Sequence, residues 1–126
     1  MVKMTNFRYY NRRPDGKHKE DCVTRAISTA TGLKYGAVAN LLELSASEYE
    51  CDKLCVCCYH YLLEEILCYP VKFCLDRERV SDVVNMYQHN ILIIRIQGHL
   101  TSSINGRLLD IWDCGDERVD CFWIVK

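Results

Sequence analysis

The sequence of 126 residues has no stretch of apolar residues long enough to cross a membrane. A spanning helix needs about 20 consecutive apolar residues, and no run approaches that length. The first residues also lack the apolar core that a secretion signal carries. These absences predict a cytoplasmic protein that does not interact with membranes.

The sequence also has almost no excess of charge of either sign. The formal net charge is −1 and the isoelectric point is about 6.4, so no global field attracts nucleic acid or an acidic membrane. The N-terminal segment is a local exception, because basic and aromatic side chains are interleaved there. They are Phe7, Arg8, Tyr9, Tyr10, Arg12, Arg13, Lys17, His18 and Lys19. Such segments sometimes bind nucleic acid but are more often solvated loops, and we favour the loop.

No internal repeat, low-complexity segment or linker divides the chain. A chain of this length normally forms one domain. Residues 1–20 are polar and contain turn residues at positions 14–16, so we expect them to form a basic N-terminal arm. Residues 21–126 are expected to form the single folded domain.

Cysteine, by contrast, is abundant, with nine residues. The odd number and the missing secretion signal favour free thiols in a reducing compartment. A cluster at residues 51–68 is a candidate metal site, because it contains several potential zinc ligands. They are Cys51, Cys55, Cys57, Cys58, His60 and Cys68. Zinc sites usually present Cys pairs on turns or strands, whereas these thiols lie in a predicted helix. We therefore expect core packing, and neither a metal nor another cofactor.

Hydrophobic spacing predicts helices in the first two thirds of the chain. A helix is expected from Asp21, a good N-cap, to a stop at Gly32. Three more are expected over 35–45, 48–67 and 77–88, with a short strand at 71–75. In the second helix Val38, Leu41, Leu42 and Leu44 are predicted to face inward.

The period then changes to that of strands. Strands are predicted over 91–96, 99–104, 107–113 and 119–125. Asn105-Gly106 between the second and third of these is a strong hairpin signal. Helices followed by an antiparallel sheet of about four strands predict an α+β fold.

Cys22 differs from the other cysteines in its position at the start of a predicted helix. Backbone N–H groups and the helix dipole stabilise a thiolate there and lower the thiol pKa. Asp21 opposes that effect by its like charge, so a cationic partner is needed. Cys22 is therefore the candidate nucleophile.

The hairpin register selects partners for Cys22. A two-residue turn at Asn105-Gly106 places Thr101 opposite Asp110 and His99 opposite Trp112. Because side chains alternate along a strand, His99, Asp110 and Trp112 share one face. Asp110 can then orient the imidazole, and Trp112 can cover their hydrogen bond.

Asp113 is the alternative to Asp110 as the acidic residue. Strict alternation places Asp113 on the opposite face, and a bulge at 113–115 would bring it round. The register favours Asp110.

The order of these residues resembles that of papain-like cysteine peptidases and their relatives, the bacteriocin-processing double-glycine peptidases and transglutaminase-like proteins. More closely, residues 21–32 with Gly98–Thr101 and Asp110–Asp113 look like small phage and prophage-type proteins of that fold. In papain-like enzymes an Asn followed two positions later by Trp orients the histidine, and Asp110-Ile111-Trp112 is similar. The resemblance spans roughly residues 20–125. It implies a papain-like domain with a Cys22-His99-Asp110 triad and Trp112 beside the substrate.

The chain also departs from that family. Papain-like peptidases commonly place a Gln about six residues before the nucleophile as an oxyanion donor, and Gly16 stands there instead. His18 and Asn11 are both candidates for the second donor, beside the Cys22 N–H. The chain is also shorter than a typical papain-like peptidase.

Three functions follow from these observations. The first is hydrolysis of a peptide, isopeptide or other amide bond through an acyl-enzyme on Cys22, with a peptide or protein as substrate. The second is a catalytically inactive papain-like fold that acts as a protein-binding or inhibitory module. The third, which the composition disfavours, is nucleic-acid binding through the basic arm.

Overall fold

In the computed structural model the chain is described over residues 6–17, 21–49, 55–75 and 78–126. Within these ranges it forms helices and one sheet, and the α+β class is confirmed. The elements in order are β1 (Phe7–Tyr9), α1 (Cys22–Thr31), α2 (Tyr35–Tyr49), α3 (Val56–Tyr61), the π-helical segment η1 (Leu62–Ile66), β2 (Val71–Phe73), α4 (Val80–Met86), β3 (Ile91–Ile96), β4 (His99–Ile104), β5 (Arg107–Asp110) and β6 (Val119–Ile124).

The sheet is larger than the sequence predicts, and it is mixed. Its described strands are six, in the order β1-β5-β4-β3-β6-β2. β1 pairs with β5 in parallel, and every other pairing is antiparallel. The predicted antiparallel sheet of about four strands is therefore wrong in strand number and at one edge. β1 and β2 are edge strands of three residues each, too short to show an alternating pattern.

The β4–β5 hairpin follows the predicted turn. Asn105 and Gly106 have φ angles of 50° and 80°, which suits the type I′ turns that match the twist of a hairpin. Ile104 pairs with Arg107 and Ser102 with Leu109, as the predicted register requires. β5 ends at Asp110 rather than at Asp113, so the predicted His99–Trp112 strand pair is not formed.

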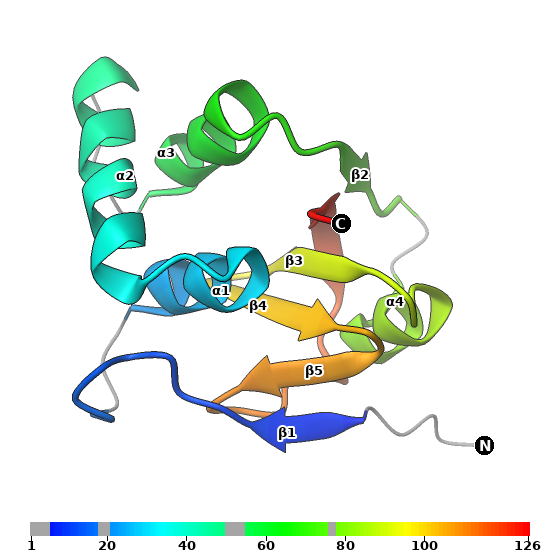
Figure 1. The fold of residues 1–126 in the computed structure, drawn as a ribbon. Helices are drawn as coiled ribbons and strands as arrows, with labels where there is room; N and C mark the ends of the chain where they lie inside the picture. The colour runs from blue at the N-terminus through cyan, green and yellow to red at the C-terminus, as the bar shows by residue number, and fades with distance from the viewer. Residues whose placement is uncertain (1–5, 18–20, 50–54, 76–77) are drawn as a thin grey trace.

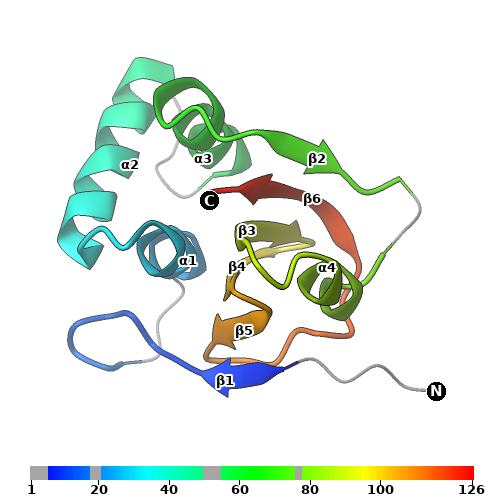
Figure 2. The ribbon, with the colours of Figure 1, turned by 45° about the vertical axis from the view of Figure 1, so that its right-hand side comes forward.

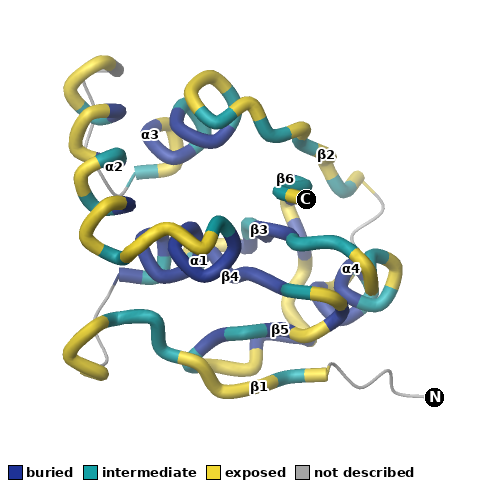
Figure 3. The backbone as a smooth tube through the Cα atoms, viewed as in Figure 1, coloured by how far each residue is buried: buried dark blue, intermediate teal, exposed yellow. Residues whose placement is uncertain are grey.

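Helices cover both faces of the sheet (Figures 1 and 2). α1, α2 and α3 lie on one side of the strands, and α4 lies on the other. Side chains alternate along β3, so that Ile93 packs with the first group of helices while Leu92, Ile94 and Ile96 pack with α4. This explains why β3 is apolar at almost every position. β3 and β4 are accordingly buried over most of their length (Figure 3).

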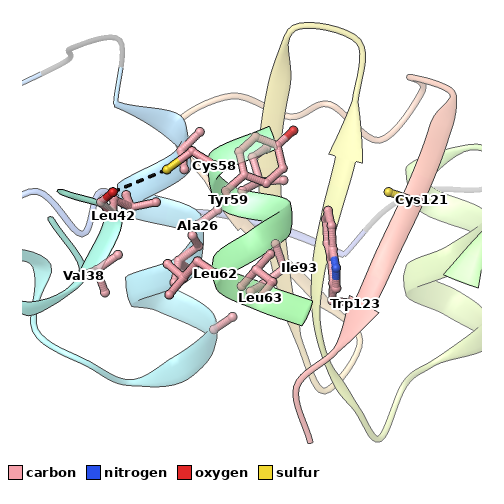
Figure 4. Close-up of a cluster of buried hydrophobic side chains, with 14 residues drawn as sticks. Ala26, Val38, Leu42, Cys58, Tyr59, Leu62, Leu63, Ile93, Cys121 and Trp123 are labelled. Carbon is pink, nitrogen blue, oxygen red and sulfur yellow. Dashed lines mark hydrogen bonds between the residues drawn. The ribbon is translucent and has the colours of Figure 1, made fainter. Parts of the chain in front are cut away.

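The larger core cluster lies between α1, α2, α3 and the sheet (Figure 4). Ile27, Leu62, Leu63, Ile93 and Trp123 are all fully buried within it. Cys58 also belongs to this cluster, and its thiol donates to the carbonyl of Leu42 at 3.4 Å. α1, which carries Cys22 at its first position, is thereby fixed against β4.

Two helix predictions need correction. The helix expected over 48–67 does not begin at 48, because α2 continues to Tyr49 and α3 begins after Cys55. Its last part is π-helical, and the Leu67 N–H donates to the carbonyl of Leu62 at 2.9 Å. Leu44 was predicted to face inward but is 60% exposed, whereas Val38 and Leu42 are buried. None of the described helices is both long and apolar enough to span a bilayer.

Candidate active site

Cys22 occupies the first position of α1, where the sequence predicts it. Asp21 is the N-cap residue, but its carboxylate makes no capping hydrogen bond. It accepts instead from Arg25 Nε and the Tyr35 hydroxyl, both at 2.6 Å, and from Arg13 Nη1 at 3.1 Å. The Asp21 side chain therefore leaves the first turn of α1 uncapped. The N–H groups beside the thiol are therefore not occupied by the cap.

His99 opens β4 and binds the carboxylate at the end of β5. Its Nε2–H donates to Asp110 Oδ2 at 2.6 Å, and both side chains are largely buried. The Trp112 ring meets the imidazole edge to face, with ring centroids 5.2 Å apart. Trp112 is 46% exposed, so it shields one side of this pair and presents the rest of its ring to solvent.

Of the two aspartates that the sequence leaves open, the structure places Asp110 on His99. Asp113 is exposed, and its Oδ1 accepts from the Gly115 N–H at 3.1 Å. Asp110 Oδ1 also accepts from the Ile111 N–H at 2.7 Å and from Arg25 Nη1 at 3.3 Å. The carboxylate is thus held on both oxygens and is oriented toward the imidazole.

Charges around Cys22 favour its thiolate. Burial by itself would raise the pKa of the Cys22 thiol. Hydrogen bonds from His99 and the backbone of Leu100, together with the positive charges of His99 and Arg25, outweigh burial and lower that pKa below its ordinary value. His99 and Arg25 are the cationic partners that the neighbouring Asp21 makes necessary.

The pKa of His99 moves in the opposite direction. Burial disfavours its charged form, but hydrogen bonds to Asp110, Cys114 and Cys22 raise the pKa to about 11. Burial likewise opposes ionisation of Asp110, and the contact with His99 is the main reason that the pKa of Asp110 is lowered nonetheless. The site therefore favours a thiolate, an imidazolium and a carboxylate at neutral pH.

Arg25 is a site residue that the sequence reasoning missed. Its guanidinium joins Asp21 to Asp110 through bonds of 2.6 and 3.3 Å, so it links the start of α1 to the end of β5. The spacing of Asp21 and Arg25, four residues apart on a helix, is the signal that could have suggested it. Its contact with Asp110 depends on the tertiary fold.

A cavity of about 380 Å³ adjoins the thiol. One part of its wall is apolar, formed by Val23, Val56, Tyr59, Ile96 and Leu100, and the rest is polar. Cys22 and His99 lie in this wall, together with the Arg95–Asp120 ion pair at 3.5 Å. The nucleophile therefore opens into a space large enough to take an apolar side chain.

Of the two residues predicted as the second oxyanion donor, Asn11 is described by the structure, and it does not line the cavity. The Asn11 amide is engaged with its own loop, donating to the carbonyl of Lys17 at 3.0 Å and accepting from the Arg13 N–H at 3.1 Å. His18 lies outside the described residues. Gln97 and the Tyr59 hydroxyl also line the cavity, and sequence reasoning missed both as candidate donors. Burial raises the pKa of the Tyr59 hydroxyl, which keeps it a neutral donor.

Cys114 packs in the core, in the cluster with α4. It also lies close enough to His99 to contribute to the raised pKa of the imidazole. Sulfur of Cys114, a ring nitrogen of His99 and a carboxylate oxygen of Asp110 all lie within 4.8 Å of one another. In the described part of the chain this is the one group of at least three side chains close enough to share a metal ion.

The cysteines expected to fill a helix between residues 51 and 68 behave differently from one another. Cys58 is buried as predicted, but Cys57 and Cys68 are exposed, so core packing is wrong for those two. Cys55 lies at the N-cap of α3 rather than inside a helix, with its sulfur 2.9 Å from that of Cys57. Cys51 lies outside the described residues.

Comparison of the chain with family models, with curated proteins and with solved structures found no match. The function is therefore argued from the geometry of Cys22, His99 and Asp110 and from the cavity beside them.

Proposed function

We propose that this protein is a cysteine hydrolase that cleaves a peptide, isopeptide or other amide bond. The observation that carries the proposal is the connected set of Cys22, His99 and Asp110, in which the pKa of the thiol is lowered and the carboxylate holds the imidazole at 2.6 Å. A nucleophile, its base and a group that orients the base are the parts that acyl transfer requires.

The mechanism follows from the ionic form of the pair. The Cys22 thiolate attacks the carbonyl carbon, and N–H groups in the first turn of α1 stabilise the oxyanion. His99 donates its proton to the leaving amine as the C–N bond breaks, leaving an acyl-enzyme on sulfur. His99 then takes a proton from water as the hydroxide adds to the acyl carbon, and release of the acid restores the thiolate.

The cavity supports a peptide-like substrate with an apolar side chain near the scissile bond. The apolar part of its wall adjoins Cys22, and Trp112 contacts His99 without lining the cavity. The resemblance of the three motifs to papain-like peptidases supports the same class of reaction. We extend that resemblance to a papain-like domain, of the small phage type, that acts in the cytoplasm.

The contacts of the N-terminal arm favour this function over nucleic-acid binding. Arg12 donates to the Ser28 hydroxyl and Arg13 to Asp15, Asp21 and Tyr35. β1 joins the sheet beside β5. These arginine side chains are therefore engaged within the fold, where Arg13 supports Asp21 at the start of α1 and Arg12 binds Ser28 farther along the same helix.

The test is labelling with peptidyl vinyl sulfones that carry either an apolar or an acidic residue next to the electrophile. The wild-type protein should react with the apolar probe faster than with the acidic one, with the adduct mapped to Cys22. Cys22→Ser and His99→Ala should abolish the adduct, and Cys68→Ser, which changes an exposed cysteine elsewhere, should not. An adduct that forms equally in His99→Ala would contradict the proposal.

A further inference from the structure

Cys114 is a buried thiol for which the proposed hydrolysis has no use. It lies in the segment between β5 and β6 and is 1% exposed. Its other contacts are with the cluster under α4, whereas Cys22 packs against the cluster under α1. The His99 ring lines the same cavity as Cys22 and lies close to the sulfur of Cys114, so it is located where the two clusters meet.

The atoms around Cys114 match the ligands that zinc prefers. Zinc in proteins binds thiolate, imidazole and carboxylate, and sites with three protein ligands leave the fourth position open. Here a sulfur, a ring nitrogen and a carboxylate oxygen lie within 4.8 Å of one another. All three come from buried or largely buried side chains, which distinguishes the group from an exposed acidic cluster.

The dimensions also fit. Bonds to zinc of about 2.0 to 2.3 Å in a tetrahedron place neighbouring ligand atoms roughly 3.3 to 3.8 Å apart. The His99–Asp110 contact of 2.6 Å has to open by less than about 1 Å. The sulfur of Cys114, which lies within 4.8 Å of both atoms, has to move toward the pair by at most about 1.5 Å. Asp110 remains anchored through its Oδ1 by Arg25 and the Ile111 N–H, so Oδ2 is the oxygen that faces the ion.

We propose that Cys114, His99 and Asp110 form a binding site for a thiophilic divalent cation such as Zn²⁺, and that the bound ion switches off the Cys22 nucleophile. The ion takes the place of the proton that His99 shares with Asp110, and Cys114 loses its proton when it becomes a ligand. Both protons pass to solvent. An imidazole that holds the metal cannot shuttle a proton for Cys22. The inhibitory consequence rests on the proposed hydrolase function, whereas metal binding does not.

The experiment is calorimetric titration of the full, chelator-treated protein with Zn²⁺, together with absorption spectroscopy of the protein loaded with Co²⁺. The expected result is one ion per chain and a sulfur-to-cobalt charge-transfer band. Cys114→Ser should weaken Zn²⁺ binding by at least about 10-fold and remove that band. Cys22→Ser should keep both, which separates this site from simple capture of metal by the nucleophile.

Cys121→Ser is the matched control, because Cys121 is another buried cysteine, located in β6, and its replacement should leave binding unchanged. Circular dichroism reports whether each variant is folded, and the cobalt band of the wild-type protein tests the proposal even where a variant is not. Absence of that band overturns it, as does loss of the band in Cys22→Ser with retention in Cys114→Ser. If the metal binds as expected but Cys22 proves unreactive without it, the hydrolase proposal fails and the metal site stands.

Discussion

Asp110 is the residue at which the contacts of the candidate site converge. His99 donates to one carboxylate oxygen, and Arg25 and the Ile111 N–H donate to the other. These donors come from β4, α1 and the residue that follows β5. One buried carboxylate therefore sets both the orientation of the imidazole and its charge.

Asp110→Asn should lower the turnover of an amide substrate, or the rate of Cys22 acylation, by about 10²-fold. The amide keeps the size of the carboxylate but removes the charge that holds the pKa of His99 high. Asp113→Asn is the control, since Asp113 contacts the Gly115 backbone and not His99. Equal losses in the two variants would show that Asp110 has no special role.

Arg25 makes a separate prediction about stability. Its guanidinium is buried between the carboxylates of Asp21 and Asp110. Arg25→Met leaves those charges without their shared partner, which should cost about 3 to 5 kcal/mol in the free energy of unfolding. Urea denaturation measures this loss. Arg107→Met removes an exposed arginine from β5 and should change stability by less than about 0.5 kcal/mol; a similarly small effect at Arg25 would contradict the account.

At the scale of elements, β1 supports the site from the edge of the sheet. Phe7, Arg8 and Tyr9 pair with Leu108, Leu109 and Asp110, and the next N–H, of Tyr10, donates to the carbonyl of Asp110 at 2.9 Å. Phe7 also packs against the cluster that contains Leu108. The backbone that carries the Asp110 carboxylate is therefore fixed by the N-terminal arm.

Deletion of residues 1–10 should destabilise the protein by about 2 kcal/mol, mainly through the loss of Phe7 from the core. It should also slow Cys22 alkylation, because the Asp110 backbone loses a neighbour. Deletion of residues 1–5 removes none of these contacts and is the control. Equal thermal stability and equal alkylation rates of the two truncations would contradict a supporting role for β1.

The elements also show which parts of the site can be predicted from sequence. Asn105-Gly106 determines the register of β4 and β5 locally, and the register brings His99 to Asp110. Cys22 at a helix start is equally a local feature. β1 lies in a polar, basic segment, and its strand state depends on pairing with β5, which lies about 100 residues away in the chain.

Arg25 and Cys114 also reach the site through the tertiary fold, which local sequence patterns do not predict. The position of Cys114 beside His99 follows from the path of an irregular segment between two strands, which has no periodic pattern. The start of α3 was also misplaced, because Leu54, Cys55 and Cys58 recur near helical spacing and extend the helical pattern across the helix boundary that the structure has at Cys55. Contacts that depend on tertiary packing were the ones that sequence alone did not supply.

At the scale of the whole molecule, the site couples stability to pH. The pKa of folded His99 is raised above its value of about 6.5 in the unfolded chain. The folded state therefore binds more protons above that pH, and the stability contributed by His99 is full below pH 6.5 and declines as pH rises toward the folded pKa. Asp110 behaves oppositely, since its pKa is lowered and its contribution is lost as pH falls below about 4.

The coupling can be measured by comparing the free energy of unfolding of Cys22→Ser with that of the double variant Cys22→Ser/His99→Gln. Both variants lack the Cys22 thiol, so its titration does not contribute to the difference. The stability advantage of the protein that keeps His99 should be largest near pH 5 to 6 and should shrink steadily toward about pH 9. Urea denaturation across that range provides the measurement. An advantage that is constant or grows with pH would mean that His99 is not held in its charged form.

The most direct test of the account is the rate at which each cysteine of the folded protein reacts with iodoacetamide at neutral pH, followed by peptide mapping. Cys57 and Cys68 are exposed whereas Cys22 is partly buried, so access alone would make Cys22 the slower one. A thiolate paired with His99 should instead make Cys22 react at least about 10-fold faster than either, and His99→Ala should remove that advantage. Labelling of Cys22 no faster than that of Cys57 and Cys68, or unchanged in His99→Ala, would contradict the assignment of an activated nucleophile.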